Sequence, residues 1–359
     1  MTSSFATAPR LIGRCVACLM ILAPLSACNA GNSGTSSGPP PSASDPVVLY
    51  TSVDQAYAEP VLADFEVQTG IDVLPVFDVE AAKTTGLVNR LIAEKTNPQA
   101  DVWWNGEFAQ TIELAERGIL TAYFSPNAAA IPADYKDALG RWTGFGGRAR
   151  VLLVNTELVN PVPGSIMQLL DPGTASDRIG IAYPVFGTSA THAAALYALW
   201  GREEALKFYR RLADRGIRVV DGNSVVRDLV AEGQLAIGLT DTDDACGAVD
   251  KGAPVEIVFP DQHVRGLGTL IIPNTVGMVA GAPHPDVGRK LIDYLLSPAT
   301  EAKLIEIGFS QITLRPLPPG STAKSCVDTI HIRGMDVSLT EVAAQIEAAK
   351  VDMAELFVR

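Results

Sequence analysis

Three aspartates stand within four positions of the sequence, at Asp241, Asp243 and Asp244. They follow the apolar start of "LAIGLTDTDDACG", where a strand is expected to end and a helix to begin. Ionised carboxylates this close repel one another, and their pKa values rise until a positive charge lies among them. A hard cation such as Fe³⁺, Ca²⁺, Mg²⁺ or Mn²⁺ would supply that charge, and so would a protonated amine. Alternatively, Asp241 ends the strand and Asp243 caps the helix.

A second stretch has the composition of an anion-binding loop. "GTSATH" places Thr188, Ser189 and Ala190 at the start of an expected helix. N–H groups there have no partner within the helix, and together with hydroxyl groups they can hold an anion. A helix N-terminus without a ligand is the alternative. The aspartates and this loop together would suit a zwitterion, for example an amino acid or an aminophosphonate. Arg148 and Arg150 of "GGRAR" could add positive charge, and we expect one of them to pair with a carboxylate.

The elements that must position these residues alternate between strand and helix. Short β-rich runs such as "PVVLYTS" precede helical stretches such as "VDQAYAEPVLADFEVQTG", which ends at Gly70 in a C-cap role. This order predicts an α/β fold with a mostly parallel sheet and helices on its faces. Further along, Asn223 is predicted to cap the helix "SVVRDLVAEG", and Ser338 with Glu341 predicts a capping box.

The N-terminal segment predicts export and a lipid anchor. Residues 1–27 combine Arg10 and Arg14 with a short apolar run, which is typical of a signal peptide. The segment ends "LSAC", which resembles a bacterial lipobox with Cys28 as the lipidated residue. An ordinary signal peptide cut near Ala27 is the alternative. Residues 28–45 are rich in Gly, Ser and Pro and predict a flexible tether.

Charge and motif content exclude several classes of protein. After residue 27 the chain has 26 basic and 40 acidic residues, a formal net charge of −14, which argues against nucleic-acid binding. The sequence lacks a nucleophile elbow, a phosphate loop and a zinc motif. Its histidines have no metal-ligand spacing, and we expect them on the surface or in loops: His192, His263, His284 and His331. Cys246 and Cys326 are free to form a disulfide outside the cytoplasm, but spacing alone does not decide whether they do.

The order of several stretches resembles the extracytoplasmic solute-binding proteins of ABC importers, and within them the ferric-iron-binding branch. The stretches that carry this resemblance are "VVLYTSVDQAYAEPVLADFEVQTGIDV", "QADVWWNGEFAQTIELAERGIL", "GGRARVLLVNTELV", "GTSATH", "NSVVRDLVAEGQLAIGL" and "GRKLIDYLLSPATEAKL". The resemblance implies a class II periplasmic-binding-protein fold with two lobes, a hinge and a cleft between them. We expect lobe 1 at 46–145 plus 256–305, and lobe 2 at 146–255 plus 306–359. It also implies a membrane permease as partner and a monomer on the outer side of a membrane.

The iron-ligand positions of that branch hold different residues in this chain. The histidine position falls on Asp54, the glutamate position on Gly106 beside Glu107, and the tyrosine pair on Asp243 and Asp244. In the same comparison, Asn223 falls on an anion-contacting position and the "GTSATH" loop on one that holds a synergistic anion. The predicted cation site is therefore a carboxylate cluster: Asp54, Glu107, Asp241, Asp243 and Asp244. Ser52, Trp104 and Arg148 are expected to line the same cleft, and Trp103 and Trp104 to point to opposite sides of a strand.

Three functions follow from these observations. The first is a receptor that captures a small solute and has neither enzymatic activity nor a cofactor. Its solute would be a hard cation such as ferric iron, bound with or without an anion. The second is a receptor for an organic amine or zwitterion, such as a polyamine or an aminophosphonate. The third is a hydrolytic enzyme that uses paired carboxylates in the cleft.

Overall fold

The computed structural model describes residues 45–78, 85–328 and 331–358, and these belong to one compact unit, Ala43–Arg359. The predicted signal peptide, Cys28 and nearly all of the tether lie outside the described residues. The strands are β1 Val47–Thr51, β2 Val73–Phe77, β3 Val102–Asn105, β4 Leu120–Thr121, β5 Thr143–Asn155, β6 Ile179–Ala182, β7 Arg218–Val220, β8 Ile237–Asp241, β9 Val255–Val258 and β10 Ile271–Val279. The α-helices are α1 Gln55–Thr69, α2 Thr85–Ala93, α3 Ala109–Glu116, α4 Gly187–Trp200, α5 Arg202–Arg215, α6 Asn223–Ala231, α7 Thr242–Asp250, α8 Pro285–Leu295, α9 Pro298–Glu306 and α10 Leu339–Leu356. The α/β prediction is confirmed.

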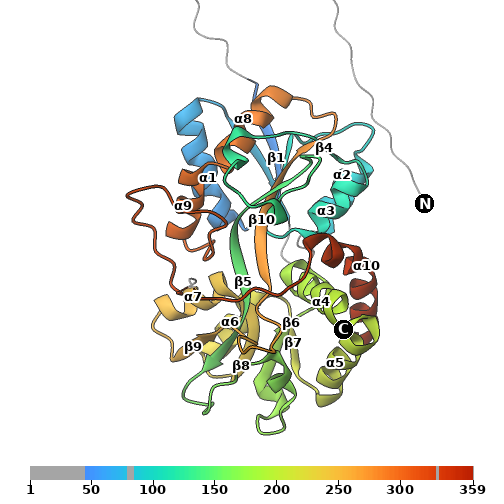
Figure 1. The fold of residues 1–359 in the computed structure, drawn as a ribbon, viewed down its shortest axis with the longest axis vertical. Helices are drawn as coiled ribbons and strands as arrows, with labels where there is room; N and C mark the ends of the chain where they lie inside the picture. The colour runs from blue at the N-terminus through green and yellow to red at the C-terminus, as the bar shows by residue number, and fades with distance from the viewer. Residues whose placement is uncertain (1–44, 79–84, 329–330, 359) are drawn as a thin grey trace, which may run out of the picture. The chain divides into compact units, whose positions relative to one another are not determined.

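The strands form two groups that share β5. In the order β2-β1-β3-β10-β5-β8-β6-β7, the β2-β1-β3 and β8-β6-β7 runs are parallel. Antiparallel pairing occurs where β10 and β5 join the runs. The first half of β5 pairs with β10, and its second half pairs with β8 and β9. Figure 1 shows β5 and β10 running lengthwise between the two strand groups. Each group carries its own helices, because a strand–helix–strand connection must cover a face of the sheet.

Helix α10 joins the helices of the two groups. It contacts α3, which follows β3, and also α4 and α5, which follow β6. One hydrophobic core therefore includes Trp103 of β3, Tyr197 of α4 and Ile346 of α10. The Asp352 carboxylate on α10 accepts hydrogen bonds from Tyr197 Oη at 2.9 Å and from Arg202 Nε at 2.7 Å. The predicted capping box of Ser338 and Glu341 is present at the start of this helix.

Local signals of the sequence explain some of the helix ends. Gly70 ends α1 in the left-handed conformation at φ 67°, as the sequence predicts. The prediction for Asn223 is wrong, because Gly222 is the N-cap of α6 and Asn223 is its first helical residue. The Asn223 side chain is instead engaged by Arg150, Thr188 and Asp241. Among the described residues, no helix is long and apolar enough to cross a membrane.

Candidate functional site

A cavity of about 70 Å³ opens between the two strand groups, where α4, α6 and α7 begin. Its walls come from the ends of β1, β3, β6 and β8 and the first turns of α4, α6 and α7. Ligands of open α/β sheets bind outside the carboxyl ends of the strands, and this cavity has that position. The volume is below the about 300–1,000 Å³ of pockets for drug-sized ligands, so it suits a small solute. Of the predicted site residues within the described part of the chain, these line it: Ser52, Asp54, Glu107, Arg148, Thr188, Ser189, Asn223, Asp241, Asp243 and Asp244.

Both carboxylate oxygens of Asp241 accept hydrogen bonds from other side chains of the protein. Arg150 Nη1 donates to its Oδ1 at 2.7 Å. Thr188 Oγ1 and Asn223 Nδ2 donate to its Oδ2 at 2.6 and 3.0 Å. Burial raises the pKa of Asp241, but the charges of Arg150 and Arg148 outweigh burial and hold this pKa below its usual value. Asp241 is therefore an ionised carboxylate that anchors the loop of Thr188 and the helix of Asn223.

Asp243 pairs with Arg148 through only one of its oxygens. Arg148 Nη1 lies 3.0 Å from Asp243 Oδ2 and 3.7 Å from Asp241 Oδ2. Asp243 Oδ1 has no hydrogen-bond partner in the described structure, although the residue is only 5% exposed. Burial raises the pKa of Asp243; Arg148 opposes this rise, while Asp241 and Asp54 add to it. The oxygen without a partner is an acceptor ready for a donor group of a ligand, because an unpaired buried polar atom is costly.

The arginines occupy the positions between the aspartates. Arg148 and Arg150 lie on β5, which pairs with β8 in a register that sets Arg150 opposite Asp241. Burial lowers the pKa of Arg148, but the charges of Asp243 and Asp241 outweigh burial, so that this pKa lies above its usual value. The Arg148 guanidinium thus remains charged and offsets the repulsion among the aspartates. Across the described residues, no group of three or more His, Cys, Asp or Glu side chains could hold a metal ion.

Asp54 and Asp244 lie at the wall of the cavity with Tyr57 beside them. Asp54 precedes α1, and its side chain makes no cap hydrogen bond to that helix. Asp244 forms an ion pair with Arg227 at 3.3 Å. Burial raises the pKa of Tyr57 to about 12, and the charges of Asp243, Asp244 and Asp54 contribute. The carboxylates predicted from three separate strand ends therefore do converge on one cavity.

Glu107 lines the cavity, but its carboxylate is engaged by the protein. It accepts hydrogen bonds from Asn105 Nδ2, the N–H groups of Ala109 and Gln110, and Thr191 Oγ1, at 2.6–2.9 Å. Two of these donors are in the first turn of α3, where the helix dipole favours a negative charge. The bond to Thr191 of α4 also links β3 to the second strand group. Burial raises the pKa of Glu107. Its geometry is that of a structural carboxylate between two helices.

The loop before α4 retains part of its predicted anion-binding capacity. Gly187 has φ 48° and starts the helix, and Thr188 and Ser189 line the cavity. The Thr188 hydroxyl donates to Asp241, but Ser189 Oγ is buried without a partner among the described residues. Ala190 departs from the prediction, because its N–H donates to Phe186 O at 3.1 Å and its side chain does not line the cavity. The donors left for a ligand are the first N–H groups of α4 and the Ser189 hydroxyl.

Two further residues lie elsewhere than the sequence indicated. The Trp104 side chain is fully buried and packs near Phe145, with ring centroids 6.0 Å apart, so it offers no face to the cavity. Both sides of β3 are covered, and Trp103 lies in the core on the other side. His192 is a buried residue of α4 and not a surface histidine. Burial lowers its pKa to about 3, and the nearby charge of Arg150 contributes.

Aromatic residues complete the cavity, and sequence reasoning missed two of them, Phe186 and Phe309. Phe309, which follows α9, stacks on Tyr57 at 4.9 Å between centroids and lies 5.0 Å from the Arg148 guanidinium carbon. Tyr183 and Phe186 line the side near α4, in an edge-to-face pair at 5.7 Å. "GFSQ", which contains Phe309, has no motif that signals a site, and only the return of the chain after α9 brings it to Arg148.

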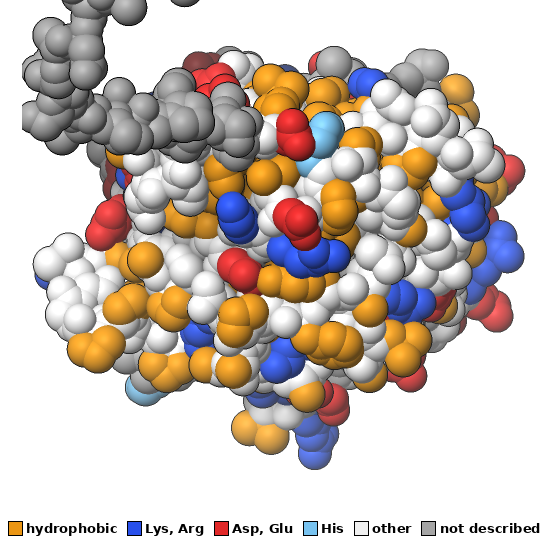
Figure 2. All heavy atoms as spheres, turned by 90° about the horizontal axis from the view of Figure 1, so that it is seen from above, with side chains coloured by type: hydrophobic (Ala, Val, Ile, Leu, Met, Phe, Trp, Pro, Cys, Tyr) orange, Lys and Arg blue, Asp and Glu red, His pale blue; other side chains and the backbone are white. Residues whose placement is uncertain are grey.

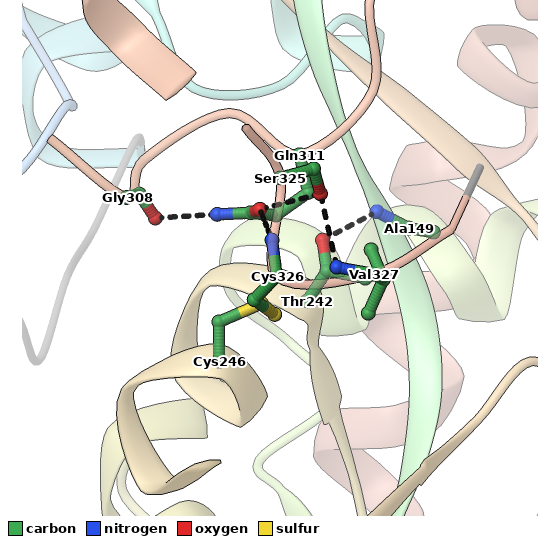
Figure 3. The surroundings of a disulfide bond; sticks show 8 residues. All are labelled: Ala149, Thr242, Cys246, Gly308, Gln311, Ser325, Cys326 and Val327. Atoms are coloured by element: carbon green, nitrogen blue, oxygen red, sulfur yellow. Dashed lines mark hydrogen bonds between the residues drawn. A yellow bond between two sulfur atoms is a disulfide. The ribbon is translucent and has the colours of Figure 1, made fainter. Parts of the chain in front are cut away.

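The disulfide that the sequence left open is formed. Cys246 of α7 is bonded to Cys326, 80 residues later, with the Cα atoms 5.8 Å apart. Figure 3 shows this bond beside the hydrogen bonds of Gln311 and Thr242. Disulfides persist in oxidising compartments, which agrees with an extracytoplasmic protein.

Comparison with known proteins identifies the family. A family model described as bacterial extracellular solute-binding protein matches residues 47–310. The chain belongs to this family. The family that the sequence resemblance implied is therefore confirmed.

The relatives of this solute-binding protein differ in what they are named for. A putative 2-aminoethylphosphonate-binding periplasmic protein of Salmonella typhimurium is 25% identical over 235 residues, which are 62% of this chain. The match covers 65% of that relative, slightly less than two thirds of its length. Iron uptake protein A1 of Synechocystis is 26% identical over 289 residues, covering 77% of this chain and 78% of the relative.

Solved structures of similar fold confirm the two-lobed architecture. A ferric binding protein from Campylobacter jejuni has a TM-score of 0.77 at 19% identity, covering 87% of this chain and 100% of the other. The periplasmic binding protein AfuA from Actinobacillus pleuropneumoniae, with fructose-6-phosphate bound, has a TM-score of 0.75 at 22% identity, covering 87% and 98%. At this identity the likeness establishes the fold alone.

Proposed function

We propose that this solute-binding protein captures a small zwitterion, with an ammonium group and an anionic group, and delivers it to an ABC permease. The observation that carries the proposal is a pair of buried atoms without partners in the described structure, Asp243 Oδ1 and Ser189 Oγ, on residues that line one cavity. Asp243 Oδ1 is an acceptor suited to an ammonium group. Ser189 Oγ and the first turn of α4 supply donors for the anionic group. An aminophosphonate such as 2-aminoethylphosphonate has both groups.

The charges of the cavity favour this ligand over a bare metal ion. Arg150 and Arg148 lie 2.7 and 3.0 Å from Asp241 and Asp243, so two carboxylates already have cationic partners. A metal ion bound to these carboxylates would have to displace a guanidinium or lie close to it. A zwitterion adds no net charge to the buried site. Its ammonium group can lie near Asp243 and Asp54, while its anionic group can accept from Ser189 Oγ and the first N–H groups of α4.

We also propose the mode of action and location of the protein. Bending of β5 and β10, which connect the two strand groups, would close the lobes around the ligand. The lobe bounds at 46–145 plus 256–305 and 146–255 plus 306–359 stay predictions, because they depend on how the two strand groups move relative to each other. A lipid on Cys28 and a tether to residue 45 would hold the receptor outside a membrane, where it acts as a monomer without catalysis.

On the face shown in Figure 2, the described acidic and basic side chains are interspersed with apolar ones.

The test is calorimetric titration of the purified protein with 2-aminoethylphosphonate, phosphate, putrescine and ferric citrate, together with elemental analysis. The expected result is saturable binding of 2-aminoethylphosphonate that is lost when Asp243 and Asp244 are both changed to Ala. A matched control is Asp228→Ala, since Asp228 pairs with Arg227 outside the cavity. Near-stoichiometric iron, or tight binding of ferric citrate alone, would overturn the zwitterion in favour of a hard cation. Turnover of the bound solute would overturn the receptor in favour of an enzyme.

A further inference from the structure

The Cys246–Cys326 disulfide links two walls of the cavity that are far apart in the sequence. On one side, Cys246 belongs to α7, whose first turn contains Asp243 and Asp244. On the other side, Cys326 belongs to the connection from α9 to α10, which also contains Phe309. The described part of 310–338 contains no helix or extended strand of its own. Its position therefore depends on hydrogen bonds to other segments of the chain and on this covalent bond.

The Phe309 side of the link is attached to β5 beside Arg148. Gly147 N donates to Ile312 O at 2.6 Å, and Ile312 N donates back to Gly147 O at 2.9 Å. Gln311 holds the returning chain, because its Oε1 accepts from Ser325 Oγ at 2.8 Å and from Cys326 N at 3.3 Å. Its Nε2 donates to Gly308 O at 2.9 Å, as Figure 3 shows. These contacts connect Phe309, through Gln311, to the cysteine.

The other end of the same α7 turn is attached to β5 as well. Ala149 N donates to Thr242 Oγ1 at 3.1 Å, one residue before Asp243 and one residue after Arg148. Asp243 and Asp244 thus lie between two attachments, the Thr242 hydroxyl before them and the disulfide after them. Arg148 and Phe309, which face them, are attached to the same strand. The atoms that form the wall are joined in a closed ring of covalent and hydrogen bonds.

We infer that the disulfide is a positioning element of the ligand site: it fixes the first turn of α7, with Asp243 and Asp244, against Arg148 and Phe309. A preorganised site loses less conformational entropy when it binds, so the bond raises affinity beyond its effect on stability. Only the ligand measurement below rests on the proposed zwitterion. The positioning itself is tested without any ligand.

The experiment compares backbone hydrogen exchange in the native protein and in the variant Cys246→Ser with Cys326→Ser. We expect faster exchange over 239–250 and 305–315 in the variant, and unchanged exchange over α1. Arg333→Gln is the matched control, since Arg333 attaches the same connection to Asp261, His263 and Gly266 through three backbone carbonyls. The control should leave 239–250 unchanged. Unchanged exchange over 239–250 in the double serine variant, or an equal increase throughout the protein, would overturn the inference.

Calorimetry with 2-aminoethylphosphonate supplies the second measurement. The double serine variant is expected to bind about tenfold more weakly, equivalent to about 1.4 kcal/mol, while Arg333→Gln retains the native affinity. If the native protein does not bind this probe, the proposed ligand fails, and hydrogen exchange alone decides the role of the disulfide. If the double serine variant does not fold, native protein whose disulfide has been reduced with dithiothreitol replaces it. Reduction should speed exchange over the same two segments, and unchanged exchange over 239–250 after reduction would overturn the inference.

Discussion

The guanidinium of Arg148 bridges the two sides of the cavity through its two terminal nitrogens. Nη1 lies 3.0 Å from Asp243 Oδ2 at the start of α7, and Nη2 donates to Gly106 O at 2.6 Å at the end of β3. Arg148 lies on β5, which both strand groups share. One side chain therefore pairs with Asp243 and contacts the opposite wall. The chain therefore supplies its own cationic group among the three closely spaced aspartates.

Replacement of Arg148 by Met should strongly destabilise the protein. The change leaves Asp243 buried without its cation partner, and loss of one member of a buried ion pair costs about 3–5 kcal/mol. Chemical denaturation should show this decrease in the free energy of unfolding. Adding Asp243→Asn to Arg148→Met should recover most of it, since the uncompensated charge is then absent. A loss below about 1 kcal/mol would show that water screens the pair well.

Asp243→Asn alone separates binding from stability. The amide oxygen can still accept from Arg148, and Asp241 lies 3.7 Å from the same guanidinium, so the free energy of unfolding should fall less than in Arg148→Met. Removing the charge that faces the ligand ammonium should weaken 2-aminoethylphosphonate by about tenfold to a hundredfold, the value of a hydrogen bond to a charged group. Calorimetry measures this directly. Native affinity in the variant would show that Asp243 does not contact the ligand. Weakened phosphate binding would show that the anionic group of the ligand contacts Asp243.

Ser189→Ala tests the anion side of the cavity. Ser189 Oγ has no partner in the described part of the protein, so removing it should leave the melting temperature unchanged or slightly higher. Affinity for 2-aminoethylphosphonate should fall by about threefold to tenfold. The matched control is Ser165→Ala on the N-cap of the short helix Ile166–Leu170, which lowers stability but not affinity. Equal affinity for native and Ser189→Ala protein would contradict the proposed donor.

The buried His192 should make the protein less stable in mild acid. Burial lowers the pKa of His192 to about 3, whereas in the unfolded chain it titrates near 6.5. The unfolded state therefore binds more protons between these values, and the stability that His192 contributes above pH 6.5 is lost as pH falls toward 3. At pH 5 the loss amounts to about 2 kcal/mol.

Chemical denaturation of the native protein and of His192→Leu at pH 7 and pH 5 measures the loss of stability that is due to His192. Asp243 and Glu107, whose pKa values are raised, have the opposite pH dependence, but they are the same in both proteins and cancel in the difference. The variant should gain about 2 kcal/mol relative to the native protein on going from pH 7 to pH 5. A difference that does not depend on pH would mean that the pKa of His192 is the same in the folded and the unfolded state.

Patterns within single elements were predictable from the sequence. The alternation of strands and helices, the Gly70 helix end and the capping box of Ser338 depend on residues close together in the chain. The convergence of Asp54, Glu107 and the aspartates of α7 on one cavity followed from the rule that parallel strands end at one edge, together with the family resemblance. These features need no knowledge of side-chain packing.

The partners of those residues were decided only by the tertiary structure. Register between β5 and β8 sets Arg150 opposite Asp241, and the return of the chain after α9 brings Phe309 to Arg148. Packing on both sides of β3 buries Trp104, and the fold places Cys326 at Cys246. The sequence by itself predicted the family and the acidic residues at the strand ends that line the cavity. Whether those acids stand free or paired depends on distances between segments up to 95 residues apart, and local sequence does not encode such distances.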